Sequence, residues 1–539
     1  MGIGEDFLFR LHGAKGRREA LRLVPKGETA AVPEDPRSLP AFLAREDGSE
    51  IRVPVGTLPD GRPLALPASI AWKAAIEVGA SGSGKTRKLL SRLKTEILWN
   101  LGLPAFGSPA PADYRSDLEL LDPKTETFDE VKKLVAALYI ESSPGRQRQL
   151  RQMIRVFDWT AERVTPLPLY HLGGSDTSDA FLAHQRLDVE IAASRLTYTD
   201  GVKGLAFMYG RLLAVKDIPP NVAYARRFFR DAGFRTKELT NLRSRDVAAY
   251  FASLEESLPR QTMEAFLRRL EHTLSFPEIR ASVGMPPNAV ARLLPSQDHR
   301  VTIGNYGPGT RLPLGKALER ASHRLVDLLR VLPRRNPATP FFLLLEEAAV
   351  LLSQAGELTD PLANASRTLR AFNVGITLAA QDFAAALPKP LARTLLLNAR
   401  AFVLFQSRDE AELVASFADE IPGLDGTSAQ KKAALVREIQ NLPPRHAYLY
   451  VKGYTPLRFV TLDMPDPAPA AGMTDAELLA IFDREILPAS TVPLAVADEE
   501  IRKWEAETVG APPSAGKTPA GPRPKGIADL LAGLEEDES

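Results

Sequence analysis

Residues 79–86, GASGSGKT, have the types and spacing of a phosphate-binding loop, GxxxxGK(S/T). The glycines let backbone N–H groups converge on a β-phosphate at a helix start, the lysine bridges the β- and γ-phosphates, and the threonine hydroxyl binds Mg²⁺. A chance match in a chain of this length has a probability on the order of one in a hundred. The residues predicted to bind ATP are Gly79, Ser81, Gly82, Ser83, Gly84, Lys85 and Thr86.

Two glutamates, Glu346 and Glu347, follow five apolar residues in the stretch FFLLLEEAAVLL. An acidic residue at the carboxyl end of a core strand is placed to bind the water shell of Mg²⁺, and the next one can polarise the attacking water. We therefore predict Glu346 as a magnesium ligand, through water, and Glu347 as the catalytic base. The alternative is a strand that runs into a helix whose first turn carries glutamate because of the helix dipole. The upstream phosphate-binding loop, with several strands between, favours ATP hydrolysis and argues against a small-molecule kinase.

A glutamine, Gln381, ends a predicted strand in RTLRAFNVGITLAAQDF, after the glutamate pair. An amide there can sense the γ-phosphate or its attacking water, and Arg370 or Arg367, just ahead of that strand, could stabilise transition-state charge. The alternative is that Gln381 caps a helix and that both arginines lie on the surface. Spacing alone favours a surface position for either arginine.

Short apolar runs separated by helix-like stretches predict the scaffold that positions these residues. The run AAIEVGA precedes the phosphate-binding loop, and KTRKLLSRLKTEIL follows it with apolar residues at helical spacing. Upstream, IRVPVGTLPDGRPLALP predicts a hairpin around a Pro-Asp-Gly turn. Further strands are predicted in DLELLDPKTE, RQMIRVFDWT, RVTIGNYG, PFFLLLEEAAVLL, NVGITLAAQD and ARAFVLFQ. We therefore expect an α/β fold with a predominantly parallel sheet.

The predicted domain organisation follows from changes in composition along the 539 residues. Charged, Leu- and Ala-rich helices without a strand-like run predict an all-α domain inserted into the α/β core. The stretch VGAPPSAGKTPAGPRPK predicts a flexible linker before an amphipathic acidic tail, GIADLLAGLEEDES. The predicted units are a small N-terminal segment (1–50), the P-loop motor (51–174 and 291–465), the all-α insertion (175–290), a C-terminal helical extension (466–508) and the flexible linker with its tail (509–539).

Composition excludes several classes of protein. The absence of cysteine rules out disulfides, zinc ribbons, iron–sulfur sites and cysteine catalysis, and seven scattered histidines do not favour a histidine-bound metal. A net charge of +1 gives no global basic field, so a nucleic-acid surface would have to be a local patch. The N-terminus has no signal-peptide core, and the longest uncharged run falls short of the roughly 18 apolar residues that span a bilayer. We expect a cytoplasmic protein.

In this order, the motifs resemble the HerA/FtsK superfamily of ring-forming motors, and most closely the TraG/TraD-like coupling proteins of conjugative type IV secretion. The resemblance runs from about Ile51 to Asp463 and is carried by GTLPDGRPLALPASIAWKAAIEVGASGSGKT, LELLDPKTETFDEV, LLLEEAAVL and LRAFNVGITLAAQD. An arginine stands eleven residues before the motif glutamine, as it often does in coupling proteins. The resemblance implies a RecA-like motor that uses ATP and Mg²⁺ and drives double-stranded DNA through the channel of a homo-hexamer.

The resemblance also implies a role for each motif residue. It assigns the ATP site to Lys85, Thr86 and the glutamate pair, the sensor to Gln381, and an arginine finger, acting on a neighbour's nucleotide, to Arg370. Two features depart from the family, because glutamate stands where the first acid is usually Asp and no apolar segment matches the N-terminal transmembrane helices of coupling proteins. The second departure favours a soluble relative, or one that a partner recruits to the membrane.

Two basic stretches bear on the cargo. YARRFFRDAGFRTKELTNLRSR interleaves arginine with aromatic residues inside the predicted insertion, and GRQRQLRQMIR is the other. Such runs are more often solvated helix faces, although either could contact DNA phosphates. The first hypothesis is an ATP-driven double-stranded DNA translocase. The alternative is an ATPase that remodels or exports a protein, with the helical domain and residues 526–539 as docking elements. An ABC-type transporter subunit is disfavoured, because no LSGGQ-like helix start precedes the glutamate pair.

Overall fold

The structure of the protein is a computed structural model. It describes residues 38–39, 42–43, 50–159, 162–167, 200–240, 242, 244–254, 259–294, 300–332, 337–353, 369–381, 387, 389–407 and 427–510. Most of the predicted N-terminal segment lies outside the described residues. The linker and the acidic tail lie outside them from residue 511 onward.

Across the described ranges, eleven strands form one large sheet in the order β2-β1-β12-β11-β10-β3-β9-β8-β4-β7-β5, and β13 pairs with β6 separately. The strands are β1 (Arg52–Thr57), β2 (Pro63–Pro67), β3 (Ala75–Val78), β4 (Asp117–Asp122), β5 (Ile154–Asp158), β6 (Arg163–Val164), β7 (Val301–Asn305), β8 (Phe341–Leu345), β9 (Val374–Ala380), β10 (Ala401–Leu404), β11 (His446–Val451), β12 (Leu457–Thr461) and β13 (Val492–Pro493).

Most of the sheet is parallel. From β10 through β3, β9, β8, β4 and β7 to β5, each strand runs parallel to its neighbour. The other side is antiparallel and consists of β11, β12, β1 and β2. The predicted α/β fold with a predominantly parallel sheet is therefore confirmed, as is the predicted β1–β2 hairpin. Strands β11 and β12 were not predicted, and they lie between that hairpin and β10, the neighbour of β3.

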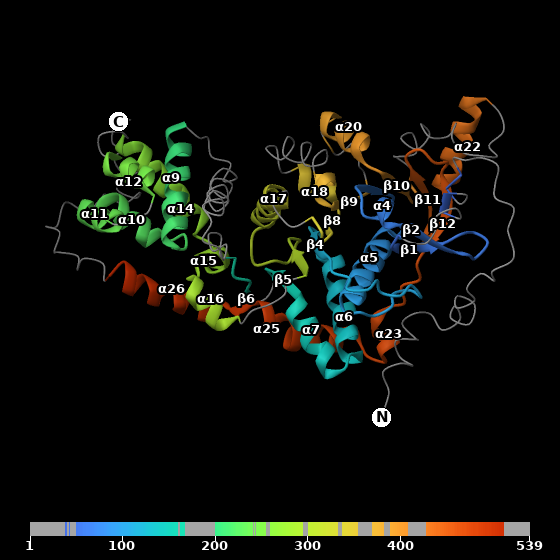
Figure 1. Ribbon diagram of the computed structural model, residues 1–539, viewed down its shortest axis with the longest axis horizontal. Helices are drawn as coiled ribbons and strands as arrows, with labels where there is room; N and C mark the ends of the chain where they lie inside the picture. The colour runs from blue at the N-terminus through green and yellow to red at the C-terminus, as the bar shows by residue number, and fades with distance from the viewer. Residues whose placement is uncertain are drawn as a thin grey trace, which may run out of the picture.

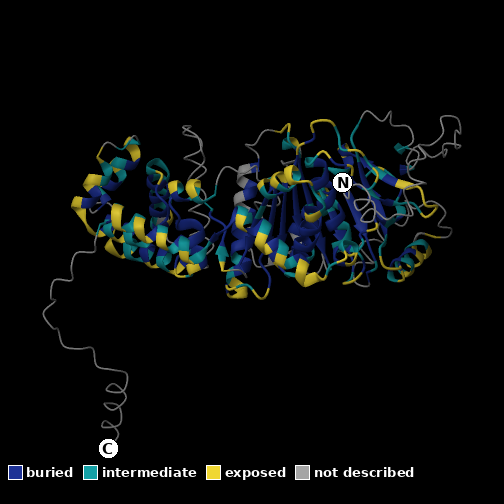
Figure 2. Ribbon diagram, turned by 90° about the horizontal axis from the view of Figure 1, so that it is seen from below, coloured by how far each residue is buried: buried dark blue, intermediate teal, exposed yellow. Residues whose placement is uncertain are grey.

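Strand β8 shows why the central strands read as unbroken apolar runs. Phe341, Leu343 and Leu345 belong to one hydrophobic cluster, whereas Phe342 and Leu344 belong to the other. A strand that faces two covered surfaces needs apolar residues at every position. Helices accordingly pack on both faces of the sheet, and the strands are buried between them (Figure 2).

The helices around the sheet come from both halves of the chain (Figure 1). They are α4 (Ala68–Ala71), α5 (Lys85–Asn100), α6 (Glu126–Glu141), α7 (Pro144–Met153), α17 (Leu314–Val331), α18 (Ala348–Ser353), α20 (Lys389–Asn398) and α22 (Ser428–Gln440), with a 3₁₀ turn, η3 (Leu369–Phe372). Helix α7 takes the first residues of the predicted RQMIRVFDWT strand, so β5 begins only at Ile154.

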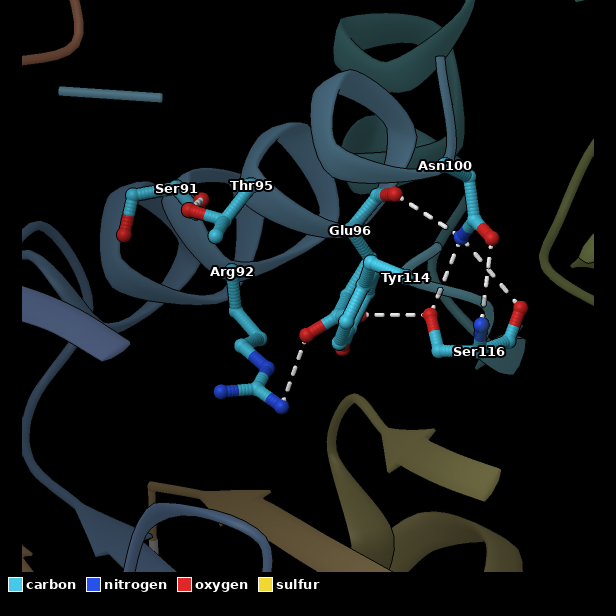
Figure 3. Close-up of polar contacts among 7 residues, drawn as sticks. All are labelled: Ser91, Arg92, Thr95, Glu96, Asn100, Tyr114 and Ser116. Carbon is cyan, nitrogen blue, oxygen red and sulfur yellow. Dashed lines mark hydrogen bonds and ion pairs between the residues drawn. The ribbon is translucent and has the colours of Figure 1, made fainter. Parts of the chain in front are cut away.

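Helix α5, which follows the phosphate-binding loop, is fixed at its far end by a buried polar network (Figure 3). Glu96 Oε2 accepts hydrogen bonds of 2.6 Å from both Tyr114 Oη and Ser116 Oγ. Its other carboxylate oxygen pairs with Arg92 at 2.8 Å, one turn earlier on the helix. Because a buried carboxylate is stable only when it is paired and hydrogen-bonded, this network ties α5 to the segment that enters β4.

A helical unit, residues 200–293, stands beside the sheet (Figure 1). It consists of α9 (Asp200–Lys216), α10 (Val222–Arg230), α11 (Ala232–Leu239), α12 (Arg245–Ala252), α14 (Arg260–Thr273), α15 (Pro277–Gly284) and α16 (Pro287–Leu293). Its centre is aromatic, because Tyr209, Phe228, Phe251 and Phe266 are all fully buried. Residues 175–199 of the predicted insertion lie outside the described ranges.

The C-terminal helices connect the sheet with the helical unit (Figure 1). They are α23 (Pro467–Ala471), α24 (Asp475–Ile481), the π-helical η5 (Phe482–Ile486), α25 (Leu487–Ser490) and α26 (Leu494–Thr508). Helix α24 packs on α6 beside the sheet, whereas α26 packs on α15 and α10 of the helical unit. Within the described residues, no helix combines the length and the apolar character needed to cross a membrane.

Candidate functional site

The phosphate-binding loop connects β3 to α5 and is tightly packed. A Cβ atom added at Gly79 would lie 2.5 Å from Phe405 Cβ, and one added at Gly84 would lie 3.0 Å from Arg445 Cα. Gly84 also has φ of +114°, a conformation that favours glycine. Two of the predicted glycines are therefore required by the space and the backbone of the loop.

Lys85 begins α5 and is folded back over the loop. Its Nζ donates to the carbonyl oxygen of Gly79 and, at 3.0 Å, to that of Ala80. Burial lowers the pKa of Lys85, while the nearby Glu347 and Glu346 carboxylates act in the opposite direction. A buried ammonium at the start of a helix is a strong point charge for a phosphate.

Strand register brings the predicted site residues to one edge of the sheet, the carboxyl edge. Val78 of β3 is level with Ala380 of β9, and Leu121 of β4 is level with Leu345 of β8. The residues that follow these positions therefore emerge side by side, although they come from chain segments far apart. This is the edge at which open α/β sheets bind their ligands.

Thr86 and Glu346 meet at this edge, where Thr86 Oγ1 donates to Glu346 Oε1 at 3.1 Å. Glu346 is 3% exposed, and its Oε2 is buried without a hydrogen-bond partner among the described residues. Burial raises the pKa of Glu346 to about 7, and the carboxylates of Asp122 and Glu347 add to the rise. A hydroxyl beside a buried carboxylate oxygen with no partner fits a hard divalent cation such as Mg²⁺.

Glu347 is held by two donors at a single oxygen. Its Oε1 accepts from Lys124 Nζ at 2.6 Å and from Gln381 Nε2 at 2.8 Å. Glu347 has φ of +43°, which is uncommon for a residue other than glycine. Such backbone conformations persist where the surrounding structure determines them, often at functional sites.

The structure thus brings together Lys85, Thr86, Glu346, Glu347 and Gln381. Among the described residues Gln381 contacts the second glutamate, and residues 382–386, on which the capping alternative depends, lie outside the described ranges. Arg370 lies in η3, just before β9, and its side chain is outside what the structure describes. Arg367 lies outside the described residues. The finger role of Arg370 stays a prediction.

Two residues at the end of β4 were not assigned to the site from sequence. Lys124 reaches Glu347, and Asp122 accepts from the backbone N–H groups of Lys124 at 2.8 Å and Phe128 at 2.7 Å. Burial raises the pKa of Asp122 to about 6. The Asp-Pro-Lys turn in LELLDPKTE is the sequence feature that could have indicated these two residues. Nothing in the sequence, however, indicates which carboxylate the lysine reaches.

The arginine- and aromatic-rich stretch from Tyr224 is a packed and paired surface. Its aromatic residues are buried in the helical unit, whereas Arg226 pairs with Glu271 at 2.6 Å and Arg230 with Glu264 at 3.0 Å. The interpretation as a solvated helix face therefore describes this stretch better than a DNA-contacting one.

Comparison with known proteins finds similarity in solved structures alone. No protein-family model matches the chain, and no curated protein does. The chain is similar to the bacterial conjugative coupling protein TrwBdeltaN70, at 15% identity and a TM-score of 0.45, with 80% of this chain and 93% of that chain covered. TrwB has also been solved in complex with ADP and Mg²⁺.

Two further solved structures are similar at comparably low identity. One is VirB4 of Thermoanaerobacter pseudethanolicus, at 13% identity and a TM-score of 0.45, covering 78% of this chain and 98% of that one. The other is the cytoplasmic domain of the type VII secretion ATPase EccC of Thermomonospora curvata, at 14% identity and a TM-score of 0.29, covering 82% and 32%.

Proposed function

We propose that this protein is an ATP-hydrolysing motor that assembles as a hexameric ring and translocates double-stranded DNA. The ATPase part is carried by one observation: Lys85, Thr86, Glu346, Glu347 and Gln381 meet at the carboxyl edge of the sheet. These residues supply a phosphate cradle, a cation pocket and a buried base within one site.

The chemistry divides among these side chains. Lys85 and the loop N–H groups bind the β- and γ-phosphates of ATP, and Thr86 with Glu346 would hold Mg²⁺, which neutralises phosphate charge when bound. Glu347 orients a water toward the γ-phosphorus and accepts its proton, so that ADP leaves and inorganic phosphate forms. Gln381 is placed to position the same water or the γ-phosphate, and Arg370 is proposed to stabilise transition-state charge on a neighbour's nucleotide.

The DNA and ring parts of the proposal rest on the motif order described in the sequence analysis. They are tested by ATP turnover with and without long linear duplex DNA, together with particle mass in the presence of a non-hydrolysable ATP analogue. We expect turnover to rise severalfold with DNA and the mass of a hexamer with the analogue. No stimulation, with no assembly larger than a dimer, would contradict the proposal.

A second candidate function is an ATPase that remodels or exports a protein. The observation in its favour is that Arg226 and Arg230 of the helical unit are neutralised by ion pairs and that the aromatic rings beside them are buried. The two candidates differ in salt dependence, because a protein that binds DNA phosphates loses affinity steeply as salt rises. Fluorescent duplex DNA titrated at about 50 and 200 mM salt separates them. Weak binding that is insensitive to salt would favour a protein cargo.

A further inference from the structure

The contact between Lys124 and Glu347 leaves the proposed base restrained. Lys124 Nζ and Gln381 Nε2 both donate to Glu347 Oε1, at 2.6 and 2.8 Å. An oxygen that already accepts two hydrogen bonds has less capacity to accept the proton of an attacking water. The Lys124 side chain is 37% exposed and that of Glu347 only 7%, so the lysine is the partner free to swing away.

The turn that carries Lys124 is fastened to the loop between β7 and α17, residues 306–313. The Thr125 hydroxyl shares its one proton between two acceptors, Asn305 Oδ1 at 3.0 Å and the carbonyl oxygen of Pro308 at 2.8 Å. A Cβ atom added at Gly307 would lie 2.3 Å from Thr125 Oγ1 and 2.6 Å from the carbonyl carbon of Lys124. No methyl group fits between the two segments, so a shift of one displaces the other.

The same loop contacts the helical unit at its other end. Arg311 Nε pairs with Glu278 Oε1 of α15 at 3.1 Å, and Arg311 N donates to the carbonyl oxygen of Trp159 at 2.7 Å. The Glu278 side chain is 9% exposed, whereas that of Arg311 is 40% exposed. Loop 306–313 therefore touches the helical unit through Arg311 and the Lys124 turn through Gly307 and Pro308.

We propose that Lys124 is a positioning residue that restrains Glu347 between rounds of hydrolysis, and that loop 306–313 connects this restraint to the helical unit. The inference rests on the proposed ATPase function. When the helical unit moves on engaging cargo, the loop displaces the Lys124 turn, the ammonium leaves Glu347 Oε1, and that oxygen becomes available to the water. The rate of ATP hydrolysis therefore depends on whether cargo is bound.

The test compares basal ATP turnover, without added cargo, in wild type, Lys124→Met, Gly307→Ala and the double variant. Lys124→Met should raise kcat on the order of tenfold, which is the rate change expected when one charge-assisted hydrogen bond to the base is lost. The KM for ATP should not change. Gly307→Ala should raise kcat by a smaller factor, and the double variant should be no faster than Lys124→Met. Gly315→Ala is the matched control, since a Cβ atom there meets nothing within 4 Å.

Two results would contradict the inference. An unchanged or lower kcat in Lys124→Met would show that Lys124 does not restrain Glu347. A double variant in which the two increases in kcat multiply would show that the loop does not act through Lys124. Lys124→Arg should return kcat to the wild-type value, because it keeps a cation beside Glu347. A wild type no faster than Lys85→Ala would instead contradict the proposed ATPase function itself.

The helical end of the connection has its own test. Arg311→Gln should raise basal kcat part of the way toward Lys124→Met, because it releases the loop from Glu278. Arg292→Gln is the control, since Arg292 pairs with Glu500 on α26 and not with the loop. Equal kcat in Arg311→Gln and Arg292→Gln would show that the helical unit does not act on Lys124 through loop 306–313.

Discussion

The carboxyl edge of the sheet and the surface of the helical unit differ in how their charged side chains are placed. At the edge, Glu346 and Glu347 are 3% and 6% exposed, and one oxygen of Glu346 has no partner among the described residues. In the helical unit, Arg230 and Glu264 pair at the surface with side chains 57% and 34% exposed, and aromatic rings such as Phe228 fill the centre. Burying an unpaired charge costs several kcal/mol, so two adjacent buried carboxyl groups at a strand end make this edge a candidate ligand site, whereas the aromatic centre of the helical unit supports packing.

The largest predicted effect is a difference in ATP turnover between variants of two lysines on the same helix, α5. Lys85→Ala should lower kcat/KM for ATP roughly 10³-fold, about 4 kcal/mol, without lowering thermal stability, because its charge serves the ligand and not the fold. Lys88, one turn on, pairs with the buried Glu77. Lys88→Met should therefore keep ATP turnover and lose about 3 kcal/mol of stability. ATP turnover and melting curves measure both, and equal turnover in the two variants would break the comparison.

The helical unit should respond through packing alone. Phe228→Ala should lower the free energy of unfolding of this unit by about 3–5 kcal/mol, because the ring is fully buried among other rings. ATP affinity should stay at the wild-type value. Calorimetry, together with titration of a fluorescent ATP analogue, gives both quantities. The control is Lys203→Ala, at an exposed position of α9 in the same unit, and an equal loss in the two variants would show that the aromatic centre is not the stabilising feature.

A smaller effect tests whether every buried carboxyl group around the sheet serves ATP. Both carboxylate oxygens of Glu141, on α6, are buried without a hydrogen-bond partner among the described residues, and burial raises its pKa to about 8. Between pH 4.5 and about 8, the Glu141 carboxyl group is protonated in the folded state and ionised in the unfolded state. The contribution of Glu141 to the free energy of unfolding is therefore present at low pH and is lost as pH rises through that range.

Glu141→Gln should therefore flatten the fall in stability toward pH 8, by about 1 kcal/mol after allowing for solvent screening. Burial lowers the pKa of the neighbouring Lys94 to about 8, so stability from this lysine rises again at higher pH. Melting temperatures at pH 5, 8 and 10 for wild type and variant provide the measurement. ATP turnover at pH 7 should not change, and a loss of turnover would place Glu141 among the functional charges.

The sequence indicated those parts of the site that are local in the chain. The loop 79–86 and the glutamate pair each combine residue type, spacing and an adjacent apolar strand, so their positions at strand ends could be predicted. Lys124 could not be assigned, because it meets Glu347 across 223 residues and only the strand order brings the two together.

The helical unit was harder to interpret, because its arginine and aromatic residues alternate on short helices. Residue types in YARRFFRDAGF suit either a DNA surface or a packed helix, and only burial of Tyr224, Phe228 and Phe234 decides between them. Strands β11 and β12 were missed for a related reason. HAYLYV and LRFVT are short, and the sequence does not show that they join the sheet beside β10.

ATP affinity and ATP turnover measured side by side in Glu347→Gln test the central claim most directly. Glutamine keeps the shape of the side chain and can still accept from Lys124, but it cannot take the proton of a water. We predict wild-type affinity for ATP and a kcat lowered about 10²–10³-fold. Turnover at the wild-type rate would place the catalytic base elsewhere and contradict the assignment of this edge as the hydrolysis site.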